Sequence, residues 1–143
     1  MSLSKSQLKL INSLQQKKYR TKHGLFIAEG TKVVKEFLSS NLELEHLFFV
    51  DGFGFEDIEQ VTKISDIELK KVSSLKTTNN VLALFKIPRE DTLINEGLIL
   101  VLDEINDPGN FGTIIRLCDW FEVKQLICFS NTLLLDVPPS IPP

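Results

Sequence analysis

The sequence predicts an α/β protein, and three observations support this fold class. Short apolar runs typical of strands alternate with segments whose hydrophobic residues recur at helical spacing. The chain has 143 residues and is 43% hydrophobic and 24% charged, which is enough to bury a core. A polar stretch near residue 90 interrupts the pattern. We therefore expect a small three-layer α/β unit, followed by a shorter strand–helix–strand unit.

The first helix is expected to begin at Ser4, because Ser4 and Gln7 have the spacing of a capping box. Hydrophobic spacing continues this helix to about Lys18, and Gly24 ends the segment. The other elements expected in the first unit are strands at 25–28, 46–50, 61–63 and 80–86, a helix from 31 to about 41, a short helix at 56–60, and a helix opened by a second capping box at Ser65–Glu68.

We place the first domain at residues 1–88, a linker at 89–96 and a second unit at 97–143. The second unit is expected to contain a strand at 97–103, a loop at 104–110, a helix at 111–121 and a strand at 124–129. Two strands joined by a helix are expected to be parallel. The tail at 133–143 is atypical, because its prolines fit neither a helix nor an interior strand.

Composition excludes several classes of protein. No apolar run approaches the roughly 18 residues of a membrane span, and the polar N-terminus is not a signal peptide. Cys118 and Cys128 lie in apolar patterns, so we expect buried free thiols and a cytoplasmic location. Neither a disulfide nor a metal site is expected.

Charge is distributed unevenly along the chain. The net charge of −3 argues weakly against a nucleic-acid partner. Residues 1–28 nevertheless contain no acid, and residues 36–59 contain no Lys or Arg. The basic residues of the first segment are Lys5, Lys9, Lys17, Lys18, Arg20 and Lys22. Binding of a polyanion and a simple solvated face are both open interpretations of these charges.

The loop at 107–110 is the strongest candidate site in the sequence. It follows a buried strand and precedes a helix, which is where α/β proteins hold ligands. Asn110 is expected to be the helix N-cap, and Gly112 would allow close approach of a ligand. Arg116 is poorly placed for the helix dipole, so we expect it to serve an anion or a hydrogen-bond network. A surface arginine and an ordinary cap are the alternative.

The helix that follows is expected to bury one side and expose the other. Arg116 should share an exposed face with Thr113 and Trp120. The residues expected on the buried side are Ile114, Ile115, Leu117, Cys118 and Phe121.

Residues 102–116 read Leu-Asp-Glu-Ile-Asn-Asp-Pro-Gly-Asn-Phe-Gly-Thr-Ile-Ile-Arg. This run resembles the first signature of the SpoU (TrmH-type) branch of the SPOUT RNA methyltransferases, Leu-Asp-x-x-x-Asp-Pro-Gly-Asn-x-Gly-x-x-x-Arg. Residues 17–20, followed by 24–30, are similar to the substrate-binding domain of these enzymes, which resembles a small RNA-binding ribosomal protein. The resemblance covers about residues 5–130, so residues 97–143 would hold the first strand–helix–strand portion of a SPOUT domain.

The resemblance implies transfer of a methyl group from S-adenosylmethionine to a ribose 2′-hydroxyl of rRNA or tRNA, by a homodimer. By position, Asn110 and Arg116 match the catalytic asparagine and arginine of the family. Lys17, Lys18, Arg20 and Lys22 would contact RNA phosphates. An arginine has been assigned as the base, but a guanidinium stays protonated, so we expect Arg116 to bind the phosphate and stabilise the developing alkoxide.

The sequence departs from the family after Thr132. Two later signatures, which build the cofactor site and the knot, are absent from residues 133–143. We therefore expect a truncated form that binds no S-adenosylmethionine and has no cofactor-binding residues. The same truncation puts the native homodimer of the family in doubt for this chain. A non-enzymatic RNA-binding module is the alternative. An unrelated doubly wound domain with a phosphate-binding loop would need a Gly-x-Gly-x-x-Gly run, which the chain lacks.

Overall fold

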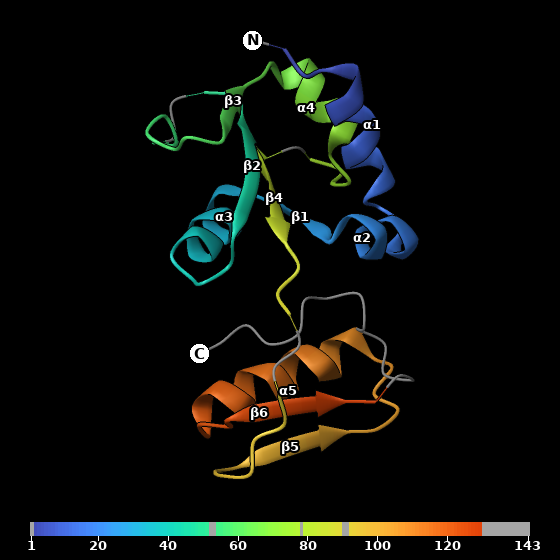
Figure 1. Ribbon diagram of the computed structural model, residues 1–143, viewed down its shortest axis with the longest axis vertical. Coiled ribbons are helices and arrows are strands. Elements are labelled where there is room, and N and C mark those ends of the chain that lie inside the picture. Colours follow the sequence, from blue (N-terminus) through green and yellow to red (C-terminus); the bar gives the residue numbers. More distant parts are fainter. Residues whose placement is uncertain (1, 52–53, 78, 90–91, 130–143) are drawn as a thin grey trace. The chain divides into compact units, whose positions relative to one another are not determined.

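Two compact units, Met1–Pro88 and Arg89–Pro143, make up the chain. A computed structural model describes residues 2–51, 54–77, 79–89 and 92–129 (Figure 1). The tail at 133–143, and part of the turn expected at 51–54, lie outside the described residues. The mixed α/β class is confirmed.

Unit 1 consists of four helices and four strands among its described residues. The helices are α1 (Lys5–Ser13), α2 (Lys17–His23), α3 (Thr31–Leu38) and α4 (Asp66–Val72). The strands are β1 (Leu25–Glu29), β2 (Leu44–Phe49), β3 (Val61–Lys63) and β4 (Val81–Lys86). They form one sheet in the order β1-β4-β2-β3. β4 pairs antiparallel with β1 and β2, while β2 and β3 are parallel.

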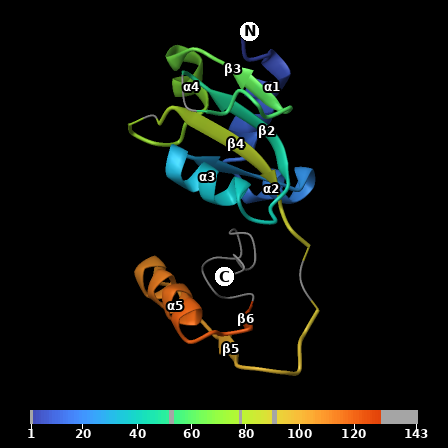
Figure 2. The ribbon, with the colours of Figure 1, turned by 90° about the vertical axis from the view of Figure 1, so that its left-hand side faces the viewer.

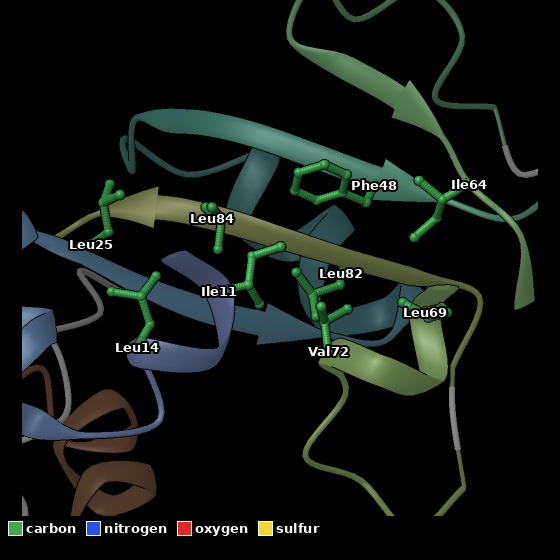
Figure 3. Packing of buried hydrophobic residues seen from close by; sticks show 9 residues of the cluster. All are labelled: Ile11, Leu14, Leu25, Phe48, Ile64, Leu69, Val72, Leu82 and Leu84. Carbon is green, nitrogen blue, oxygen red and sulfur yellow. The ribbon is translucent and has the colours of Figure 1, made fainter. Parts of the chain in front are cut away.

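The sheet of unit 1 is covered on both faces. Figures 1 and 2 show α1 and α4 on one face and α3 on the other. β4 explains why both faces are buried, because its consecutive side chains alternate between them. Leu82 and Leu84 belong to the cluster shown in Figure 3, together with Ile11 of α1 and Leu69 of α4. All described residues from 81 to 85 are buried, so β4 is the centre of a three-layer unit.

The opposite face of the sheet is built largely from aromatic rings. Val81, Ala83 and Phe85 of β4 point into this second cluster, where Val34 of α3 is fully buried. The rings of Phe26 and Phe85 stack with centroids 5.9 Å apart. Rings at this spacing add to the stabilisation from burial alone.

Both predicted capping boxes are confirmed. Ser4 accepts from the backbone N–H of Gln7, and the Gln7 side chain accepts from the backbone of Ser4. The second box has the same reciprocal pattern at Ser65 and Glu68. Glu68 also accepts from the backbone N–H of Leu3 at 2.9 Å, which ties the N-terminal segment to α4.

Two helix predictions in unit 1 are wrong. The first helix does not continue to Lys18, because α1 ends at Ser13 and buried Leu14 starts a turn into α2. The short helix expected at 56–60 is also absent. There the backbone makes one turn, with the Ile58 N–H donating to the Phe55 carbonyl at 3.2 Å. Both side chains belong to the second cluster, and the chain then extends into β3.

Unit 2 consists, among its described residues, of two strands and one helix. β5 (Ile99–Leu102) pairs in parallel with β6 (Gln125–Cys128), and α5 (Pro108–Trp120) connects them. The carboxyl ends of both strands therefore lie at the same edge of the pair, where α/β proteins place their ligands.

Most side chains expected on the buried side of α5 are exposed. Ile115, Leu117 and Phe121 are 36%, 48% and 62% exposed, which contradicts the predicted five-residue face. Ile114 and Cys118 are half-buried, and Phe111 is buried at 5% exposure. Two strands cover only a narrow stripe of a helix, so among the described residues one row of side chains, spaced i, i+3 and i+7, is covered.

Glu68 should make unit 1 sensitive to acid. Backbone hydrogen bonds from Ser65 and Leu3 lower the pKa of the Glu68 carboxyl from its ordinary value of 4.5. Its stabilising contribution is therefore present above that value and is lost as the pH falls through the lowered pKa. The Glu68→Gln variant should unfold more easily near neutral pH and lose stability less steeply below about pH 5.

Thermal unfolding followed by circular dichroism across this acidic range checks the prediction. Glu59→Gln, at an exposed position, is the matched control and should follow the unmodified protein. An identical loss of thermal stability with falling pH in Glu68→Gln and in the unmodified protein would contradict the proposed role of the carboxylate.

Candidate functional site

The turn between β5 and α5 is held by Asp107. Asp107 has extended backbone dihedrals, and its Oδ2 accepts from the Asn110 backbone N–H at 2.8 Å. Pro108 occupies the first helical position, where its fixed φ suits the helix and its missing N–H is not needed. Asp107 is therefore the N-cap. The prediction that Asn110 is the cap is wrong, because the helix starts three residues earlier than expected.

An Asp directly before a Pro was the sequence signal for this cap, since proline is favoured at the first helical position. The earlier start changes the place of Asn110. Its backbone N–H serves the cap, while its exposed side chain remains outside the capping contact. Gly109 leaves space for the cap, because a Cβ there would lie 3.1 Å from Asp107 Oδ2.

Arg116 lies on the exposed surface of α5 and reaches back toward the start of the helix. Its Nη2 donates to Thr113 Oγ1 at 3.3 Å. A Cβ on Gly112 would lie 3.9 Å from its Nη1. The guanidinium therefore covers the preceding turn, which is the usual direction of long helical side chains. The expected shared face of Thr113 and Arg116 is confirmed by this hydrogen bond.

Asn110 and Arg116 are both exposed, at the third and the ninth of the 13 positions of α5. Their six-residue separation corresponds to about 9 Å along the helix axis. Because the Arg116 side chain extends back over one turn, its charged end lies closer to the level of Asn110 than its backbone does. Around the axis the two positions lie about 120° apart, so they occupy adjacent sides of the helix.

The loop before α5 contains one strained residue. Glu104 has a φ of 52°, in the left-handed region that favours glycine. A non-glycine residue there costs roughly 1–2 kcal/mol, and such residues cluster at functional sites. The strain at Glu104, the Asp107 cap and the exposed Asn110 side chain thus lie within about seven residues of one another.

The basic segment forms its own helix, α2. Lys17, Lys18 and Lys22 are exposed, and no acidic residue precedes Glu29. Lys18 and Lys22 are four apart and share one side of the helix. The Arg20 side chain is half-buried, and its Nη1 donates to the Leu14 carbonyl at 2.9 Å. Arg20 therefore fixes the junction between α1 and α2, a role that the charge pattern alone did not indicate.

Cys118 and Cys128 are free and half-buried. Burial raises the pKa of both thiols, and the proximity of Cys118 raises that of Cys128 further. Within the described ranges, no three His, Cys, Asp or Glu residues come together as metal ligands. No described helix has the length and apolar character needed to span a membrane.

Two family models match the chain, one in each unit. The MRM3-like substrate binding domain matches residues 5–83, and the SpoU rRNA Methylase family matches residues 97–136. The chain belongs to the SpoU rRNA methylase family. The resemblance inferred from residues 102–116 is thereby confirmed.

Named relatives agree with this family. The chain is 30% identical over 122 residues to the 23S rRNA (guanosine(2553)-2′-O)-methyltransferase RlmP of Bacillus subtilis. It is 29% identical over 123 residues to the mitochondrial rRNA methyltransferase 3 of Xenopus laevis. These matches cover 82% and 76% of this chain but 49% and 29% of the relatives. The chain thus spans half or less of the length of these SpoU relatives.

Solved structures show the same fold. A TrmH-family RNA methyltransferase of Porphyromonas gingivalis matches with a TM-score of 0.80 and 31% identity, over 91% of this chain and 53% of that one. An AdoMet-bound rRNA methyltransferase of Sinorhizobium meliloti matches with a TM-score of 0.73 and 26% identity, over 95% and 58%.

The Asp107 cap gives a direct test of the site geometry. The Asp107→Ala variant should destabilise the start of α5 by about 1 kcal/mol, because the Asn110 N–H loses its acceptor. Amide hydrogen exchange should show faster exchange at Asn110 and little change in unit 1. Asp119→Ala, at an exposed position near the other end of α5, is the control and should stay within about 0.5 kcal/mol. Equal exchange in the two variants would contradict the cap.

Proposed function

We propose that this SpoU-family chain serves the 2′-O-methylation of ribose in RNA, with S-adenosylmethionine as the methyl donor and rRNA or tRNA as the substrate class. One observation carries the proposal: Asn110 and Arg116 are both exposed on a capped helix at the carboxyl end of β5. Its support comes from the family and from relatives named as rRNA methyltransferases.

Arg116 acts on the phosphate side of the target ribose. A guanidinium stays protonated near neutral pH, so it is unsuited to remove the 2′-hydroxyl proton. It forms charge-assisted hydrogen bonds to a phosphate and stabilises the negative charge that develops on the ribose oxygen. The exposed Asn110 amide supplies an acceptor oxygen and two donor hydrogens, which suits a ribose with its hydroxyl groups.

The second part of the proposal concerns α2. Lys17, Lys18 and Lys22 present positive charge on one short exposed helix, and Arg20 adds charge while it holds the helix in place. Phosphate contacts of this kind supply affinity and position the protein on its RNA, but they carry no sequence information. The target nucleotide is therefore expected to be selected elsewhere.

The described part of unit 2 does not fit the methyl donor by itself. The side chains of β6 are half-buried rather than enclosed, and Trp120 and Phe121 of α5 are 81% and 62% exposed. Residues 92–129 thus cover the strand pair only in part, and their exposed side chains do not enclose a nucleoside. S-adenosylmethionine would supply the methyl group when bound, but these residues alone do not hold it. That the short second unit compromises the homodimer of the family stays a prediction.

RNA binding should depend on α2 and on salt. Reversing two charges with Lys18→Glu and Lys22→Glu removes up to two phosphate contacts. The affinity for a single-stranded rRNA fragment should fall at least tenfold, and the slope of log affinity against log salt should decrease by about 1.4. Fluorescence anisotropy at several salt concentrations measures both quantities.

Lys32→Glu with Lys35→Glu is the matched control. It changes the net charge equally, but on α3, which covers the opposite face of the sheet from α1 and α4 (Figure 1). This variant should retain most of the affinity and nearly the full salt slope. An equal loss from both double variants would mean that total charge, rather than α2, governs binding.

Isothermal titration of S-adenosylmethionine tests the cofactor proposal. The 143-residue chain should release no binding heat at micromolar to millimolar concentrations of the donor, because residues 92–129 do not enclose it. Micromolar binding that is lost in an Asn110→Ala variant would overturn this proposal and would place a donor site within the chain.

A further inference from the structure

Thr113 links the Arg116 guanidinium to the backbone of α5. The Thr113 hydroxyl donates to the Gly109 carbonyl at 3.0 Å, one turn earlier. With its hydrogen used in that bond, Oγ1 presents its lone pairs outward as an acceptor. Arg116 Nη2 donates to this oxygen at 3.3 Å. A chain of two hydrogen bonds therefore runs from the guanidinium to the start of the helix.

An exposed arginine without such a contact samples many rotamers, and ordering it costs side-chain entropy. The hydroxyl limits that freedom, because Thr113 is itself stiff at χ1. A Cβ added at Gly112 would lie at ordinary contact distance, 3.9 Å, from Nη1, so the guanidinium passes close to the Gly112 backbone. The guanidinium is thus held beside residues 112–113 before any ligand arrives.

We infer that Thr113 is a positioning residue, which orients Arg116 toward the ribose–phosphate backbone of the RNA substrate. The inference rests on the proposed function, since it names the residue that prepares Arg116 for that role. Thr113 acts through Arg116 and does not itself touch the reacting atoms. Preorganisation of this kind improves binding by lowering the ordering cost rather than by adding a contact.

The test compares Thr113→Val with Thr113→Ser in the 143-residue chain. Valine keeps the β-branched shape of threonine but has no hydroxyl, whereas serine keeps the hydroxyl. NMR of ¹⁵N-arginine-labelled protein follows the Arg116 Nη groups, assigned with Arg116→Lys. Without ligand, Thr113→Val should change the chemical shifts of the Arg116 Nη groups and average their signals. In Thr113→Ser these signals should remain close to those of the unmodified protein.

Titration with a short oligouridylate then tests the role. The midpoint of the Arg116 shift should rise roughly two- to fivefold in Thr113→Val and remain near its original value in Thr113→Ser. Unchanged Arg116 signals in free Thr113→Val, or an unchanged midpoint, would overturn the positioning role. If Arg116 of the unmodified protein does not respond to the oligouridylate, the proposed function itself fails, and this inference fails with it.

Discussion

The candidate site depends on one hydrogen bond, between the Asp107 carboxylate and the Asn110 backbone N–H. This bond sets the residue at which α5 begins, directly after the loop that leaves β5. Each residue along a helix turns the side-chain direction by about 100°. Thr113 and Arg116, three positions apart, therefore share a face. Loss of the Asp107 bond would fray the first turn, which carries Asn110 and the Gly109 carbonyl that Thr113 contacts.

Unit 1 supplies a different kind of constraint, a rigid base for a charged helix. α2 is fixed at both ends: Arg20 donates to the Leu14 carbonyl, and Gly24 turns the chain into β1 with a φ of 64°. The Gly24 carbonyl also accepts from the Ile87 N–H beyond β4 at 2.8 Å. Because β4 is buried on both faces, this base is not expected to rearrange when RNA binds. The lysines of α2 are thus presented in advance of binding.

Local patterns in the sequence were sufficient for features that depend on neighbouring residues. The two capping boxes follow from spacing alone, and the strand at 81–86 follows from a continuous apolar run. Features that depend on tertiary contacts were missed. The break between α1 and α2 requires the buried Leu14 and the reach of Arg20, and neither is visible as periodicity.

The candidate site shows the same difference between local features and features that depend on tertiary contacts. The motif at 102–116 predicts Asn110 and Arg116 as site residues, and this stays a prediction. The N-cap was assigned to the wrong residue, because Asn and Asp are nearly equal as N-caps. The buried side of α5 was overestimated for another reason. Hydrophobic spacing shows which side chains are apolar, but it does not show how much surface two strands can cover.

Cross-linking of the 143-residue chain to rRNA, with the linked peptides mapped by mass spectrometry, tests the central claim most directly. The account requires the same RNA to be linked to two regions, α2 at Lys17–His23 and the start of α5 between residues 107 and 116. Links to α2 without any to residues 107–116 would contradict it, because the chain would then bind RNA without bringing Asn110 and Arg116 to the ribose.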